Sequence, residues 1–129
     1  MLRALVATVL LCLVVPAFAR DLGQWDETAA DIRAWYQSLR QPDNPTMSCC
    51  GEADAYWADS FEVGPNGEYV AIITDERTIA GRQYRKSGTR IVVPNHKIKT
   101  TQGNPTGHGI IFLQPGSEHV WCYLAPGGV

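Results

Sequence analysis

The strongest constraint on the fold of this chain is a series of short apolar segments, separated by turn residues, that begins near residue 56. In residues 56–63, apolar side chains alternate with polar ones, which is the period of a half-buried strand. Residues 64–67 (Gly-Pro-Asn-Gly) then give a strong turn signal. Further apolar segments lie at residues 68–74, 89–93, 109–113 and 119–124. This spacing predicts about five antiparallel strands, with a hairpin at the first turn.

A helix is predicted before the strands. Apolar residues recur there at steps of three and four positions and form one stripe: Trp25, Ala29, Ile32, Trp35, Tyr36 and Leu39. Asp26 and Glu27 favour a helix start, and Pro42 ends the helix because it drives the preceding residue out of the helical region. We therefore predict an α+β fold, with one N-terminal helix packed on an antiparallel sheet of about five strands.

The first 19 residues have the features of a signal peptide. A short start with one positive charge precedes an apolar run at residues 4–15, and Ala17-Phe18-Ala19 matches a cleavage site. The run is shorter than the roughly 20 residues that span a bilayer. The pattern predicts cleavage after Ala19 and export to the bacterial periplasm or beyond. It leaves residues 20–129 as a single soluble α+β domain, with no stable membrane anchor after cleavage.

Charge is spread unevenly along the predicted mature chain. Residues 20–62 hold nine acidic side chains against three arginines, whereas residues 77–99 hold seven basic side chains and no acidic one. The two regions either face each other or are separately solvated, and the alternative is a basic patch for an anionic partner. The overall balance is slightly acidic, which does not favour nucleic-acid binding or adhesion to a membrane.

Three cysteines remain once the signal peptide is removed: Cys49, Cys50 and Cys122. The bacterial periplasm is oxidising, so a disulfide is expected. Cys122 lies in the middle of the last predicted strand, while the adjacent pair lies in the loop that follows the helix. We predict a bridge from Cys122 to Cys49 or Cys50, with both pairings open.

The most informative histidine is His108, because glycines on both sides permit unusual backbone angles and close approach of another chain or ligand. His96 lies in a comparable loop after a predicted strand. The candidate ligand-binding residues are His96, His108, Asn95 and Asn104. We expect the two histidine loops and the Cys49-Cys50 loop to meet at one edge of the sheet, since binding residues gather on loops. The alternative is that the histidines only contact water.

The same residues suggest two further kinds of site. Two thiolates and an imidazole from Cys49, Cys50 and His108 would suit Cu(I) or Zn(II), although no C-x-x-C or H-x-x-x-H spacing is present. Cys50 and His108 are also the residues of a nucleophile-and-base pair in a small Cys-His enzyme. No local signature of a known cysteine hydrolase accompanies them.

Three strings resemble a family of small exported bacterial proteins that carry no assigned activity. They are Ser-Cys-Cys-Gly-Glu-Ala-Asp within residues 43–56, Val-Pro-Asn-His-Lys-Ile at residues 93–98, and Gly-Asn-Pro-Thr-Gly-His-Gly within residues 103–113. The resemblance covers most of the predicted mature chain and implies export. It implies no ligand or catalytic residue.

The function predicted from the sequence is that of an exported binding or interaction domain, stapled by a disulfide. Its expected partner is a small molecule or a periplasmic protein, and it needs no cofactor. The second hypothesis is a thiol and histidine protein that binds Cu or Zn or acts in redox chemistry, and the third is a small Cys-His enzyme.

Overall fold

The computed structural model describes residues 28–99 and 104–126. The predicted signal peptide, its cleavage after Ala19 and the start of the predicted helix lie outside these residues. Within them, no helix has the length and apolar character that crossing a membrane requires.

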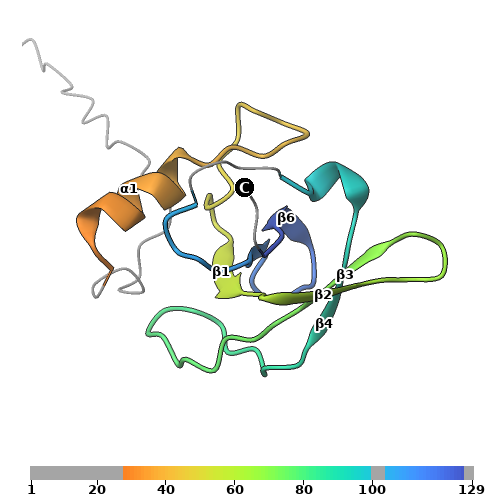
Figure 1. The fold of residues 1–129 in the computed structure, drawn as a ribbon. Coiled ribbons are helices and arrows are strands. Elements are labelled where there is room, and N and C mark those ends of the chain that lie inside the picture. Colours follow the sequence, from red (N-terminus) through yellow and green to blue (C-terminus); the bar gives the residue numbers. More distant parts are fainter. Residues whose placement is uncertain (1–27, 100–103, 127–129) are drawn as a thin grey trace, which may run out of the picture.

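Within the described residues, six short strands form two three-stranded antiparallel sheets (Figure 1). The elements are α1 (Ala30–Ser38), β1 (Asp54–Trp57), β2 (Ser60–Val63), β3 (Tyr69–Ile72), β4 (Arg90–Val93), the 3-10 helix η1 (Asn95–Lys97), β5 (Ile110–Leu113) and β6 (Val120–Leu124). One sheet has the order β1-β5-β6 and the other β2-β3-β4. The predicted fold, one helix on a single sheet of about five strands, is therefore wrong.

The error lies at residues 58–59, where one predicted strand is in fact two. The N–H of Ala58 donates to the carbonyl of Gly109 at 2.8 Å, which is the last backbone–backbone hydrogen bond of this segment with the β5 side. The N–H of Asp59 then donates to Oγ1 of Thr74 at 3.1 Å, and β2 continues by pairing with β3. The chain thus passes from one sheet to the other within two residues. The apolar alternation runs through this corner, so the sequence pattern does not reveal it.

The main core lies between the two sheets. Its buried side chains come from five strands and the adjoining residues: Tyr56, Ala58, Ala71, Ile73, Ile91, Val93, Ile111, Leu113, Val120 and Tyr123. Burial of these apolar surfaces is the main force that holds the sheets together.

A second core lies on the other face of the β1-β5-β6 sheet, beneath α1. It consists of Tyr36, Leu39, Cys49, Cys50, Ala53, Ile110, Phe112, Cys122 and Leu124. The predicted disulfide is present in this core and joins Cys49 to Cys122 across a sequence separation of 73. All four residues of β5 are buried, and they alternate between the two cores.

Ion pairs join parts of the acidic region to parts of the basic region of the sequence. Glu62 pairs with Arg90 between β2 and β4 at 2.6 Å, and Asp43 pairs with Lys97 of η1 at 3.0 Å. Arg85 instead donates to the backbone carbonyls of Gln114 and Ser117. The basic segment is thus largely engaged in contacts within the molecule.

Candidate functional site

Asp59, at the corner between β1 and β2, anchors one end of the candidate site. Its carboxylate accepts hydrogen bonds from Oγ1 of Thr74 at 3.1 Å and from the N–H of Gly109 at 2.9 Å. Nδ1 of His108 lies 2.9 Å from Oδ2 and 3.2 Å from Oδ1 of the same group. An ionised carboxylate can only accept hydrogen bonds, so Nδ1 carries the proton that it donates to Asp59. Nε2 is then the nitrogen of the ring that faces away from Asp59.

The loop before β5 fixes the backbone of His108. Asn104 donates from Nδ2 to the carbonyl of His108 at 2.9 Å, and its Oδ1 accepts the N–H and the hydroxyl of Thr106. The N–H of His108 in turn donates to Oγ1 of Thr106 at 3.1 Å. Asn104, predicted as a ligand-binding residue, therefore positions the histidine within this loop.

The glycines around His108 have separate structural reasons. Gly107 has φ +73°, a conformation that other residues rarely adopt. A Cβ on Gly109 would lie 2.3 Å from the carbonyl oxygen of Ala58 and 2.9 Å from atoms of Pro126. Close approach of the chain to Ala58, rather than of a ligand, thus requires glycine at position 109.

Gly109→Ala should therefore lower the free energy of unfolding by about 2–3 kcal/mol, because the backbone must shift to admit the methyl group. Gly67→Ala is the matched control: φ is +78° and the site of its Cβ is open, so a cost of about 1 kcal/mol is expected. Urea denaturation followed by circular dichroism measures both. An equal cost at the two positions would contradict the close packing of the corner.

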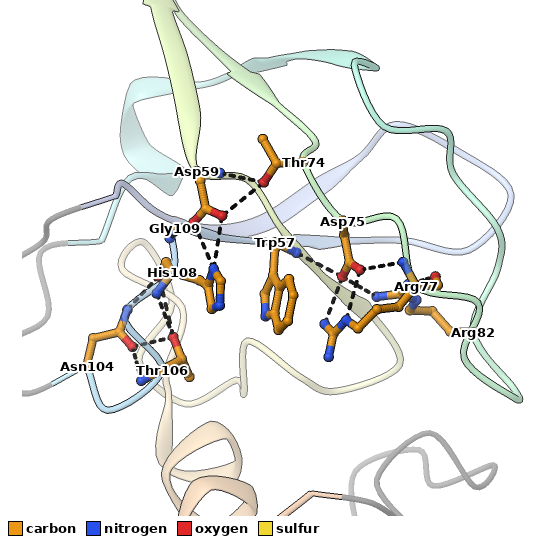
Figure 2. A network of polar contacts seen from close by, with 10 residues as sticks. All are labelled: Trp57, Asp59, Thr74, Asp75, Arg77, Arg82, Asn104, Thr106, His108 and Gly109. Carbon is orange, nitrogen blue, oxygen red and sulfur yellow. Dashed lines mark hydrogen bonds and ion pairs between the residues drawn. The ribbon is translucent and has the colours of Figure 1, made fainter.

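Trp57 lies between the side chains of His108 and Arg77 (Figure 2). The imidazole of His108 stacks on one face of the indole, with ring centroids 3.8 Å apart and planes 10° from parallel. Cζ of Arg77 lies 3.4 Å from the indole centroid, on the other face. Both outer groups are held by an aspartate, Asp59 on one side and Asp75 on the other. We call this row of His108, Trp57 and Arg77 the stack.

Asp75 is the buried centre of the second half of the site. Arg77 donates to it from Nε at 2.9 Å and from Nη2 at 2.8 Å, and Arg82 donates from Nη1 at 2.8 Å. The N–H groups of Trp57 and Arg77 also donate to this carboxylate. Burial alone would raise the pKa of Asp75, but the hydrogen bonds from the two arginines outweigh it and hold the pKa well below its usual value.

A small pocket adjoins the stack and has a volume of about 50 Å³. Its wall comes from α1 and the residue Thr28 before it, the start of β1, and the loop after β3: Thr28, Tyr36, Ala53, Asp54, Ala55, Arg77, Ile79 and Arg82. Arg77 is thus common to the pocket and the stack. Nε of Arg82 is buried and has no hydrogen-bond partner in residues 28–99 and 104–126. Burial raises the pKa of Tyr36 to about 12, so its hydroxyl stays neutral.

The structure places the predicted thiol ligands where they cannot act together. Cys49 is in the disulfide, and Cys50 is a buried thiol whose Sγ donates to the carbonyl of Tyr36 at 3.3 Å. Burial raises the pKa of Cys50 to about 12, which disfavours the thiolate needed for metal binding or nucleophilic attack. His108 pairs with Asp59 instead. Among the described residues, no three His, Cys, Asp or Glu side chains are grouped to hold a metal ion.

His96 and Asn95 lie on η1, in a different environment from His108. Nε2 of His96 is 4.0 Å from Oδ2 of Asp43, and the neighbouring Lys97 donates to Gln41 and Asp43. η1 therefore contacts the loop that follows α1. Within the described ranges, no hydrogen bond, ion pair or ring contact joins His108 to His96 or to Cys50.

The sequence reasoning missed most of the residues that surround His108. Trp57 and Asp59 lay within a predicted strand and Arg77 and Arg82 within the basic run, while Asp75 lay just after a predicted strand and was assigned no role. One signal was present: Asp75 directly follows an apolar strand, and Arg77 lies two residues beyond it. A carboxylate carried into a core by such a strand requires a cationic partner.

Searches of protein families, curated proteins and solved structures find no match to this chain. The interpretation of the pocket and the stack therefore depends on their geometry and chemistry.

Proposed function

We propose that this protein is an exported domain that binds a small ligand by an end group carrying a carboxylate and, beside it, a hydrogen-bond donor. The observation that carries the proposal is the pocket between α1, β1 and the loop after β3. The side chain of Arg82 is only 5% exposed there, and its Nε has no partner among the described residues. An oxygen atom of a ligand would satisfy this buried donor, which is costly to leave unpaired.

The charges around the pocket select the kind of end group. Arg77 and Arg82 share one carboxylate, Asp75, so this side of the pocket keeps an excess of positive charge. A guanidinium group recognises a carboxylate with good geometry. Asp54 lines the same pocket, and its carboxylate favours an ammonium or hydroxyl group next to the ligand's own carboxylate. An α-amino or α-hydroxy carboxylate meets both requirements.

The size of the pocket indicates that it holds only this end of the ligand. Pockets that enclose a whole drug-sized ligand have volumes of about 300–1,000 Å³, whereas this one has about 50 Å³. The rest of the ligand would extend along Arg77, whose side chain is 44% exposed. Export is supported by the predicted signal peptide and by the disulfide, which is typical of an oxidising compartment.

Glycine is the smallest molecule that carries both the carboxylate and the neighbouring hydrogen-bond donor of this proposal. Acetate lacks the donor and methylamine lacks the carboxylate, so these two molecules are the comparison probes. We expect glycine to bind with a dissociation constant of about 1 mM or lower, and the other two probes more weakly. The Nε–H signal of Arg82 in a proton–nitrogen NMR spectrum should shift and saturate with glycine. The corresponding signal of Arg90, which pairs with Glu62 on the surface, should not shift.

Arg77→Gln should weaken glycine binding about tenfold, through loss of a charge-assisted contact. Arg90→Gln is the matched control, because it removes an exposed arginine from an ion pair that lies apart from the pocket wall. No saturable shift of the Arg82 signal with any of the three probes would refute the proposed function.

A further inference from the structure

We propose that His108 recognises a second polar group on the same ligand, and that the protonation of His108 decides which kind of group is accepted. This inference rests on the proposed function of the pocket and adds the chemistry of the distal end of the ligand.

The geometry of the stack places the two contact points on one path. Arg77 lines the pocket and covers one face of Trp57, while His108 covers the opposite face (Figure 2). A ligand whose end group lies against Arg77 reaches His108 by passing the edge of the indole. A linear apolar chain suits this middle section, because the indole edge is an apolar surface.

The orientation of His108 leaves one nitrogen for a ligand. Asp59 occupies Nδ1, and the ring is about one-third exposed. No hydrogen bond to Nε2 occurs in the part of the chain that the structure describes. Nε2 accepts a hydrogen bond when the ring is neutral and donates one when the ring is protonated. The neutral ring therefore favours a distal ammonium or hydroxyl group, and the protonated ring favours a distal carboxylate.

The charged groups around His108 reinforce this selection. Asp59 faces the ring from the corner between β1 and β2, and Arg77 lies across Trp57, where it shares the carboxylate of Asp75 with Arg82. The other neighbours, Thr74, Asn104 and Thr106, are uncharged. With a neutral ring, the Asp59–His108 pair carries one negative charge, which repels a distal carboxylate. Protonation removes this net charge.

Three α-amino acids with the same end group test the inference: norleucine with an apolar distal end, 2-aminoadipate with a carboxylate and lysine with an ammonium group. Their affinities are measured by calorimetry at about pH 5 and about pH 8, the range in which histidine changes charge. Relative to norleucine, 2-aminoadipate should bind about tenfold better at the lower pH than at the higher. Lysine should show the opposite trend.

His108→Gln should abolish both trends, so that the affinities for 2-aminoadipate and lysine, each taken relative to norleucine, no longer change between the two pH values. His119→Gln is the matched control, because His119 is an exposed histidine in the turn before β6 and should leave both trends intact. In the wild-type protein, the NMR signal of His108 Nε2 should shift with 2-aminoadipate and not with norleucine. This measurement decides the question if the His108 variant does not fold.

The outcomes of these measurements separate this inference from the proposed function. If norleucine binds and the distal group makes no difference at either pH, the role of His108 is refuted while the pocket stands. The role of His108 is equally refuted if His108→Gln retains the trends. If glycine binds and none of the three longer amino acids does, the inference alone fails. If glycine, acetate and methylamine also leave the Arg82 signal unchanged, the proposed function itself fails, and the inference with it.

Discussion

Replacing Cys122 or Cys49 with serine is expected to lower the free energy of unfolding of the oxidised protein by about 4 kcal/mol. The disulfide closes a loop with a sequence separation of 73, and restricting the unfolded chain over such a length contributes roughly this much in the chain-entropy account. Both cysteines are fully buried in the core beneath α1, so their loss also disturbs packing. Urea denaturation under oxidising conditions measures the effect.

Cys50→Ala is the matched control for this prediction. Cys50 is buried in the same core but forms no disulfide, so its truncation should cost only about 1 kcal/mol. Titration of thiols should find one in the wild-type domain after removal of the predicted signal peptide. A Cys50 variant that loses about 4 kcal/mol, beside a Cys49 variant that loses only about 1 kcal/mol, would show that the bridge uses Cys50 instead.

Asp75→Asn should lower the free energy of unfolding by about 3–5 kcal/mol, the usual cost of removing one partner from a buried ion pair. The carboxylate is fully buried and holds two arginines, of which Arg82 is itself buried. The amide keeps the shape of the side chain but leaves both guanidinium groups without their counter-ion. Denaturation at neutral pH measures the loss. Glu62→Gln, in an ion pair whose side chains are about half exposed, should leave the free energy of unfolding nearly unchanged, because solvent screens such a pair.

The same aspartate predicts how stability changes with pH. Its pKa is lowered in the folded protein, since the hydrogen bonds from the two arginines outweigh the cost of burial. Its stabilising contribution is therefore complete above the unfolded-state pKa of about 4 and is lost as the pH falls from there towards the folded-state value. The wild-type protein should lose stability over that acidic range, and Asp75→Asn should lack this part of the loss. Parallel pH profiles for the two proteins would contradict the assigned role of Asp75.

The sequence predicted those parts of the fold that are determined locally. The segments that form β3, β4, β5 and β6 were identified because turn residues bound them and because their apolar runs are short. The division into two sheets was not predicted, since it depends on hydrogen bonds of residues 58–59 with Gly109 and Thr74, far away in the sequence. Pairing with residues that are distant in the sequence leaves no periodic pattern in the sequence of the strand itself.

In the candidate site, too, the residues with a local sequence signal were predicted and those that depend on distant partners were not. His108 was identified from its flanking glycines and does lie in the stack, and Asn104 proved to hold its loop. Arg77 and Trp57 were not identified, because their roles depend on a partner brought by another part of the chain. The basic segment that suggested a surface patch was explained only when its partners, such as Glu62 and Asp43, were placed in space.

Strand β5 forms a common wall between the two cores, with Ile111 and Leu113 on one side and Ile110 and Phe112 on the other. The core beneath the helix and the core between the sheets therefore cannot lose their order independently, because either loss exposes half of the same strand. In native-state hydrogen exchange, the amides of Ile110–Leu113 should be among the slowest and should open only with the whole domain. Gly109 immediately precedes this strand, and its N–H donates to the carboxylate of Asp59. The end of the stack that contains His108 is therefore attached to the strand that we expect to open last.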